Sequence, residues 1–134
     1  MERYMAHADK VNIMIADDDP AMRQLLGIIL RSEGYTKLEY ASDGQQALDL
    51  LSNATLPFHM AFLDINMPGF SGLEVMEMCK PKAPDCFYVI ISANSAMENV
   101  VAALKKGARG FIVKPYTAGK IHEILAKFKA SATT

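Results

Sequence analysis

Five short segments typical of β-strands alternate with five stretches of helical periodicity along this chain, and this alternation restricts the possible folds more than any other feature. Four of the segments are nearly all apolar, which is typical of parallel strands that helices cover on both faces. These four segments are residues 11–16, 58–64, 86–92 and 110–114. The pattern therefore predicts a doubly wound α/β fold, in which a five-stranded parallel sheet lies between two layers of helices.

The remaining elements follow from local signals. The segment 36–41 alternates polar and apolar residues, which predicts an edge strand. The first helix is expected to begin at Pro20, which suits a first turn, and to end at Gly34. The other helices are expected at 43–53, 73–80, 96–108 and 117–130. The residues expected to face the core are Met97, Val100, Val101 and Leu104 in the fourth helix, and Ile121, Ile124, Leu125 and Phe128 in the fifth.

Composition limits the classes of function. The chain has 134 residues, is 51% hydrophobic and carries a net charge of −1. These values predict one folded domain at 10–130 between short tails at 1–9 and 131–134. The near-neutral charge argues against direct binding of nucleic acid or of a membrane surface. The start of the chain has no apolar signal-peptide core and no apolar run is long enough to span a membrane, so a cytoplasmic location is expected.

Cysteine and histidine do not form a recognisable motif in this sequence. Cys79 and Cys86 are expected to be reduced, partly buried thiols, with a redox pair as the alternative. His7, His59 and His122 are scattered, and none lies in a phosphotransfer motif. His59 is expected within the buried strand 58–64 and His122 on a helix, so we interpret all three histidines as structural.

Polar residues follow the predicted strands at the carboxyl ends, where doubly wound sheets bind their ligands. The residues at these ends are Asp17, Asp18 and Asp19 after the first strand, Asp64 after the third, Ser92 after the fourth and Lys114 after the fifth. Carboxylates that converge raise each other's pKa unless a cation joins them, and a few oxygen ligands suit Mg²⁺. A carboxylate, a divalent ion, a lysine and a hydroxyl together match what a transferring phosphoryl group requires.

Several of these residues also have a purely structural explanation. Asp19 fits the N-cap of the helix that Pro20 begins better than it fits a metal ligand. Ser92 by itself is typical of a cap for the helix near 96–106, and Lys114 before a proline is typical of a turn. The functional hypothesis therefore depends on their placement at one edge of the sheet.

Four motifs together resemble the receiver domain of two-component response regulators, in particular its CheY-like single-domain members. The motifs are ADDDPAMR, FLDINMPGFSGLEV, VIISAN and GFIVKPY. They extend over about residues 11–128, which is almost the whole chain. The resemblance implies a flavodoxin-like sheet with the strand order 2-1-3-4-5 and five helices.

The resemblance also implies a role for the acidic residues. Asp64 would accept a phosphoryl group from a sensor histidine kinase, a phosphotransfer protein or a small donor such as acetyl phosphate. Asp17, Asp18, Asp64 and the backbone carbonyl of Asn66 would bind Mg²⁺, with Asp18 in the most direct contact. Lys114 would bind a phosphoryl oxygen, and its peptide bond to the following proline would be cis.

A conformational switch is implied as well. Ser92 would turn toward the phosphoryl group, and an aromatic residue on the last strand would change rotamer. That residue is Phe111, which lacks the hydroxyl of the tyrosine found in many relatives. The implied readout surface comprises the fourth helix, the fifth strand and the fifth helix. Lys105, Lys106 and Arg109 lie there, either to meet an acidic protein partner or as a solvated helix end with a favourable dipole.

Three classes of function remain to be separated. The main interpretation is a phosphorylatable switch that is not an enzyme, acting through a downstream protein as a monomer or a phosphorylation-linked dimer, either alone or as part of a longer regulator. The alternative is a Mg²⁺-dependent aspartyl-phosphate phosphatase or phosphotransferase, which Asn66 disfavours because such enzymes need a second acid there. A degenerate receiver is the third class, and the intact Asp18, Asp64, Ser92 and Lys114 argue against it.

Overall fold

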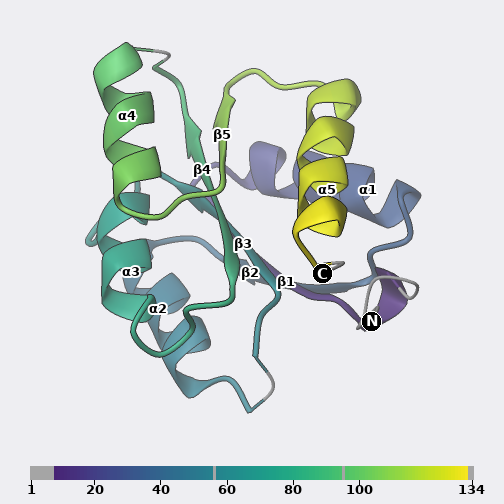
Figure 1. The fold of residues 1–134 in the computed structure, drawn as a ribbon, viewed down its shortest axis with the longest axis horizontal. Helices are drawn as coiled ribbons and strands as arrows, with labels where there is room; N and C mark the ends of the chain where they lie inside the picture. Colours follow the sequence, from purple (N-terminus) through teal and green to yellow (C-terminus); the bar gives the residue numbers. More distant parts are fainter. Residues whose placement is uncertain (1–7, 56, 95, 133–134) are drawn as a thin grey trace.

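The computed structural model describes residues 8–55, 57–94 and 96–132 and contains a parallel sheet between two layers of helices (Figure 1). The strands occur in the order β2-β1-β3-β4-β5 across the sheet. Their bounds are Asn12–Ala16 for β1, Lys37–Ala41 for β2, Met60–Asp64 for β3, Phe87–Ser92 for β4 and Gly110–Val113 for β5. The predicted fold class and strand order are confirmed, and β2 is an edge strand as expected.

Each strand is followed by a helix. The helices are α1 at Pro20–Ser32, α2 at Gly44–Asn53, α3 at Gly72–Cys79, α4 at Met97–Lys105 and α5 at Ala118–Ala132, and a short 3₁₀ turn at Ala8–Lys10 precedes β1. Helices α1 and α5 cover one face of the sheet, while α2, α3 and α4 cover the other (Figure 1). Along β1, Ile13 and Ile15 pack on the α1–α5 side, whereas Met14 packs on the α2–α4 side. The central strands β1, β3 and β4 are apolar except for Asn12, Asp64 and Ser92 at their ends, because both faces of these strands are buried.

Helix α1 begins and ends as the sequence predicts. The Asp19 side chain accepts a hydrogen bond from Ala21 N at 2.9 Å, so Asp19 is the N-cap and Pro20 is the first helical residue. Gly34 has a φ of 95°, a left-handed conformation that glycine adopts without steric cost, and it follows the end of the helix. The capped start of α1 directly after β1 fixes the path of the segment that carries Asp17 and Asp18.

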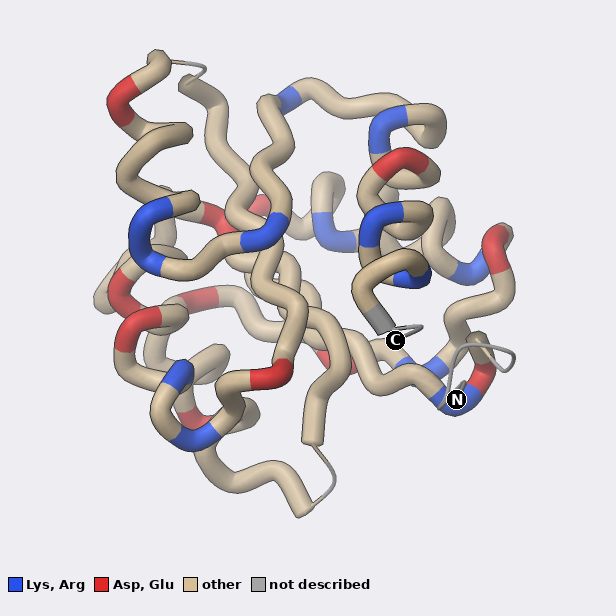
Figure 2. Tube along the Cα trace, in the orientation of Figure 1, with Lys and Arg blue, Asp and Glu red and all other residues tan. Residues whose placement is uncertain are grey.

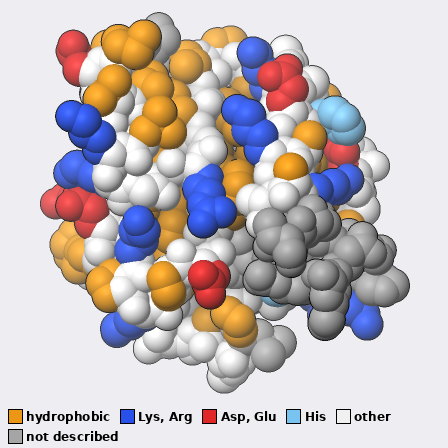
Figure 3. Space-filling model, in the orientation of Figure 1, with side chains coloured by type: hydrophobic (Ala, Val, Ile, Leu, Met, Phe, Trp, Pro, Cys, Tyr) orange, Lys and Arg blue, Asp and Glu red, His pale blue; other side chains and the backbone are white. Residues whose placement is uncertain are grey.

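The burial of α4 differs from the prediction. Met97 is 73% exposed and Leu104 is 52% exposed, and Val101 is also exposed, whereas Ala103 is the buried contact of this helix. Figure 3 shows hydrophobic side chains gathered on the surface over α4. The sequence periodicity located the helix correctly, but α4 packs at the edge of the sheet through a small residue, and the large apolar side chains point outward.

The structure describes both cysteines and two of the three histidines. Cys79 and Cys86 are free and buried, and burial raises the pKa of the Cys86 thiol to about 12. His59 precedes β3, which begins at Met60, instead of lying within the strand as expected. Its Nδ1 accepts a hydrogen bond from Asn12 N at 2.9 Å, so its side chain ties the start of β3 to the start of β1. His122 on α5 is exposed, with Nδ1 at 3.0 Å from both carboxylate oxygens of Glu33.

The ends of the chain are described only in part. Residues 1–7, which include His7, and residues 133–134 lie outside the described residues, while α5 continues to Ala132. The domain limits at 10–130 therefore stay a prediction. Among the helices that the structure describes, none is both long and apolar enough to cross a membrane.

The burial of α1 and α4 leads to a test of stability. Leu30 is fully buried, so Leu30→Ala should lower the free energy of unfolding by about 2–5 kcal/mol through lost contacts and a cavity. Leu104→Ala removes the same atoms from an exposed position and should change it by less than about 0.5 kcal/mol. Urea unfolding of both variants measures the difference. Equal losses would show that α4 buries the face that the sequence predicted.

Candidate functional site

Four strand ends bring polar side chains to one edge of the sheet. Asp17 follows β1, Asp64 is the last residue of β3, Ser92 is the last residue of β4, and Lys114 follows β5. The backbone pairing continues past the last strand, because Lys114 N donates to Ser92 O at 2.8 Å. Parallel strands that are neighbours in the sheet place their carboxyl ends side by side, so these residues converge.

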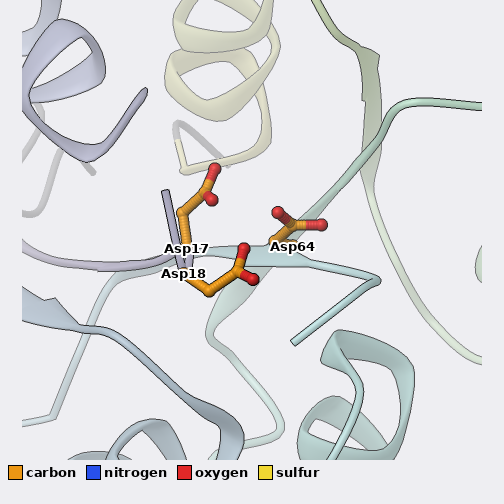
Figure 4. Close-up of side chains that lie close together, drawn as sticks. All are labelled: Asp17, Asp18 and Asp64. Atoms are coloured by element: carbon orange, nitrogen blue, oxygen red, sulfur yellow. The ribbon is translucent and has the colours of Figure 1, made fainter. Parts of the chain in front are cut away.

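Three carboxylates form a cluster at this edge (Figure 4). Oxygen atoms of Asp17, Asp18 and Asp64 all lie within 4.8 Å of one another. Asp17 and Asp64 are only 1% and 3% exposed, whereas Asp18 is exposed to solvent. Asp19 lies outside the cluster and caps α1. The three aspartates that follow β1 therefore have different environments, as expected from the sequence.

Lys114 bridges the two buried carboxylates. Its Nζ lies 2.7 Å from Asp64 Oδ2 and 2.8 Å from Asp17 Oδ2. Burial by itself would lower the pKa of Lys114, but the hydrogen bonds and charges of Asp17 and Asp64 outweigh burial and raise this pKa. Burial raises the pKa of Asp64, and the charge of Asp17 adds to this effect, while the hydrogen bonds from Lys114 and Asn66 N oppose it. The ammonium therefore stays protonated between the two carboxylates.

The same local hydrogen bond orients each polar side chain at the strand ends. The backbone N–H two residues further along donates to the side chain, from Asp19 to Asp17 Oδ1 at 2.9 Å and from Asn66 to Asp64 Oδ1 at 2.9 Å. Ser92 Oγ accepts from the third such N–H, that of Asn94, at 3.0 Å. In both aspartates this bond engages Oδ1 and directs Oδ2 toward Lys114.

The site is suited to a divalent cation. Asp17 Oδ2 is buried and, apart from its ion pair with Lys114, receives no well-aligned hydrogen bond from any residue that the structure describes. Three carboxylates and one ammonium also leave a formal charge of minus two when all are ionised. A buried carboxylate oxygen with spare acceptor capacity beside two further carboxylates is the donor set that Mg²⁺ prefers. The residues present therefore fit the ion.

The remaining residues predicted for the site, Ser92, Asn66 and Phe111, differ in how far they are buried. Ser92 is fully buried, and α4 begins at Met97 without a side-chain cap, so the alternative that Ser92 caps this helix is wrong. Asn66 is exposed beside Asp64, while Phe111 on β5 is half-buried against the α2–α4 side of the core. The Lys114–Pro115 peptide bond is cis, as the resemblance implied.

Two residues that support the site were not singled out from the sequence. Arg23 on α1 donates from Nη1 to the backbone carbonyl of Asp17 at 2.6 Å. The Tyr116 hydroxyl donates to Met22 O at 3.1 Å and thereby joins the segment after β5 to α1. Burial, reinforced by the charge of Asp17, raises the pKa of Tyr116 to about 12, so its hydroxyl stays a donor. Both residues lie in the quoted motifs, but no spacing rule distinguishes them from ordinary surface positions.

The family model of the response regulator receiver domain matches residues 13–126, which include every residue of the site. The chain belongs to this family. Receiver domains are the regulatory domains of two-component systems, and binding of Mg²⁺ is typical of them. Among curated proteins, the response regulator MprA of Mycobacterium sp. (strain KMS) is 34% identical over 120 residues, which are 90% of this chain and 50% of that one. The chain thus spans about half the length of the curated relatives that it matches.

Solved structures of receiver domains agree with this assignment. A CheY-like receiver domain protein from Methanospirillum hungatei has a TM-score of 0.82 and 28% identity, covering 91% of this chain and 95% of that chain. A structure of the CheX–CheY complex with BeF₃ and Mg²⁺ from Borrelia burgdorferi has a TM-score of 0.82 and 27% identity, with coverages of 92% and 90%. The CheY-like fold is thus shared at a similar level with both proteins.

The buried charge of Asp64 predicts a pH-dependent stability. Because burial raises its pKa above the ordinary 3.8, Asp64 favours the folded state below that pH and loses this contribution as the pH rises through its folded-state pKa. In metal-free buffer at about pH 7, Asp64→Asn should therefore raise the free energy of unfolding, and the gain should shrink at about pH 4. Urea unfolding at the two pH values measures the change in the free energy of unfolding, and Asp85→Asn serves as a control at an exposed position. Destabilisation by Asp64→Asn at neutral pH would contradict this reading of the site.

Proposed function

We propose that this receiver domain accepts a phosphoryl group on Asp64 in a Mg²⁺-dependent reaction and thereby changes its surface for a protein partner. The observation that carries the proposal is the Lys114 ammonium, which lies within 2.8 Å of carboxylate oxygens of both Asp17 and Asp64 at the carboxyl edge of the sheet. A buried nucleophile beside a fixed cation is the arrangement that phosphoryl transfer requires.

The chemistry follows from the position of these groups. A carboxylate oxygen of Asp64 forms a bond to phosphorus, and the bond from phosphorus to the donor breaks, either at an imidazole nitrogen of a phosphohistidine or at the acyl oxygen of acetyl phosphate. Lys114 is in place to bind a phosphoryl oxygen, since its Nζ already contacts Asp64 Oδ2. Asp17, Asp18, Asp64 and the Asn66 carbonyl would hold Mg²⁺, which supplies positive charge against the repulsion between carboxylate and phosphoryl oxygens.

The proposed role is that of a switch and not of an enzyme. The residue two positions after Asp64 is Asn66, which is exposed and has no carboxylic acid to protonate a leaving group. Phosphodonors would be a sensor histidine kinase or a phosphotransfer protein, in keeping with the family, and we place the exchange in the cytoplasm. Complex formation by the Borrelia CheY supports readout through a protein partner.

The surface formed by α4, β5 and α5 is the proposed readout surface. It presents the exposed apolar side chains Met97, Val101, Leu104 and Val113. Basic residues flank them at the end of α4 and before β5 (Figure 2). The Arg109 guanidinium lies 5.9 Å from the centroid of the Phe87 ring, and Lys106 Nζ lies 2.8 Å from Glu77 Oε1. A groove of about 510 Å³ next to β5 includes Phe111, Lys120 and Lys127 in its lining. We propose that the partner presents apolar and acidic side chains to this surface.

Phosphorylation by a small donor provides the direct test of function. With Mg²⁺ and acetyl phosphate, the wild-type chain should gain the mass of one phosphoryl group, and Asp64→Asn should gain none. Asp18→Asn should require a higher concentration of Mg²⁺ for the same rate. Asp19→Asn is the matched control, because it removes a neighbouring charge but retains N-cap capacity, and it should react like the wild type.

Three results would count against the proposal or a part of it. A wild-type chain that stays unmodified at saturating Mg²⁺ and acetyl phosphate would show that it is not a phosphorylated switch. Release of many equivalents of phosphate from a phosphoester by one chain would instead support the enzyme alternative. If Asp19→Asn raised the required Mg²⁺ concentration as much as Asp18→Asn, the proposed assignment of Asp18, and not Asp19, as a metal ligand would be wrong.

The switch leads to a separate prediction. Ser92 is fully buried, and its Oγ accepts a hydrogen bond from Asn94 N, so its hydroxyl hydrogen can be donated to a phosphoryl oxygen. Addition of Mg²⁺ and beryllofluoride should shift the NMR signals of the Phe111 ring in the wild type. Ser92→Ala should weaken this response at equal saturation, because the link between the site and β5 is lost. An unchanged Phe111 response in Ser92→Ala would remove Ser92 from the switch.

A further inference from the structure

The first residue of α3 approaches the backbone of the phosphoacceptor too closely to carry a side chain. A Cβ atom on Gly72 would lie 2.4 Å from the carbonyl oxygen of Asp64, 2.9 Å from its carbonyl carbon and 3.0 Å from the carbonyl oxygen of Leu63. All three neighbours are backbone atoms, so no side-chain rotation relieves the conflict. The start of α3 therefore packs directly on the peptide that carries Asp64.

A second glycine, Gly44, contacts the loop that connects β3 to α3. Gly44, the first residue of α2, donates its N–H to Pro68 O at 3.1 Å. A Cβ atom on Gly44 would lie 2.0 Å from the carbonyl oxygen of Phe70, again a backbone atom. The loop between β3 and α3 is thus in close backbone contact with the start of α2 at residues 68–70, and its two ends meet the starts of two helices.

The geometry of Asp64 depends on this loop. Asn66 N, within the loop, donates to Asp64 Oδ1, while Lys114 Nζ contacts Asp64 Oδ2. A side chain on Gly72 would fall short of an ordinary 3.4 Å contact by about 1 Å, and a displacement of that size in an active site can lower a rate by about a hundredfold. Either the Asp64 peptide or α3 must move by a comparable amount.

We propose that Gly72 and Gly44 are positioning residues for phosphorylation, which hold Asp64 and the loop after it in the reactive geometry by allowing backbone to pack against backbone. The proposal rests on the proposed function of Asp64. Neither glycine has a positive φ, so the close approach and not the backbone conformation accounts for the absence of a side chain. The capping pair Ser71 and Glu74 fixes the start of α3 from the solvent side and leaves this contact with little freedom to adjust.

The chain offers a matched control for a glycine-to-alanine series. Gly119 also lies in the first turn of a helix, α5, but a Cβ atom there would meet only Thr117 Oγ1 at an ordinary 3.6 Å. Alanine improves helix propensity at all three positions, so propensity alone predicts equal effects. Phe128→Leu, in the core between α1 and α5, serves as a second control that lowers the melting temperature away from the site.

The experiment compares phosphorylation by acetyl phosphate at saturating Mg²⁺, at a temperature where each variant is fully folded. Gly72→Ala should lower the maximal rate by at least about tenfold, with Gly44→Ala also slow, whereas Gly119→Ala and Phe128→Leu should stay within about twofold of the wild type. The NMR amide shift of Asn66 should change in Gly72→Ala and Gly44→Ala and not in the controls. More Mg²⁺ should not restore the rate of Gly72→Ala.

The outcomes separate this inference from the proposed function. A wild-type chain that is not phosphorylated contradicts the function of Asp64 itself. A phosphorylated wild type together with a wild-type rate for Gly72→Ala overturns the positioning role. If Gly72→Ala does not fold, Gly44→Ala decides, and an unchanged rate and Asn66 shift in that variant overturn the proposal. A loss of rate in Phe128→Leu as large as in the glycine variants would attribute the effect to general stability and would also overturn it.

Discussion

The ammonium of Lys114 between the buried carboxylates of Asp17 and Asp64 is the interaction on which the site depends. Two carboxylates that have lost their hydration repel each other, and burial alone already raises the pKa of Asp64. One lysine does not neutralise three carboxylates, so the cluster keeps an excess of negative charge that a divalent cation can offset. This excess of negative charge destabilises the folded state, and it also makes the site suitable for phosphoryl chemistry.

The order of the strands makes this interaction possible. Asp17, Asp64 and Lys114 are far apart in the sequence, and they meet because β1, β3, β4 and β5 are consecutive neighbours with parallel carboxyl ends. The helices that return each strand to the same edge bury both faces of the sheet. Ser92, at the end of β4, lies between β3, which ends in Asp64, and β5, so it is placed to connect the acidic cluster with the α4–β5–α5 surface.

Much of this arrangement could be predicted from the sequence because it depends on local patterns. Apolar runs and helical periodicity located the elements, and the position of Asp19 before Pro20 identified it as an N-cap. The outward orientation of Met97 and Leu104 could not be predicted, since periodicity defines an apolar face but not whether the edge of the sheet has room to cover it. The contact between Gly72 and the Asp64 carbonyl was also hidden, because close backbone approach is a tertiary property.

The residue that carries the phosphoryl group is the most direct test of the proposed role of Asp64. Borohydride converts an aspartyl phosphate to homoserine, so reduction after reaction with acetyl phosphate and Mg²⁺, followed by peptide sequencing with mass spectrometry, identifies the modified residue. We expect homoserine at position 64 and at no other aspartate, including Asp17 and Asp18. Modification of a different residue, or a stable phosphoryl group that borohydride does not remove, would contradict the assignment of Asp64 as the phosphoacceptor.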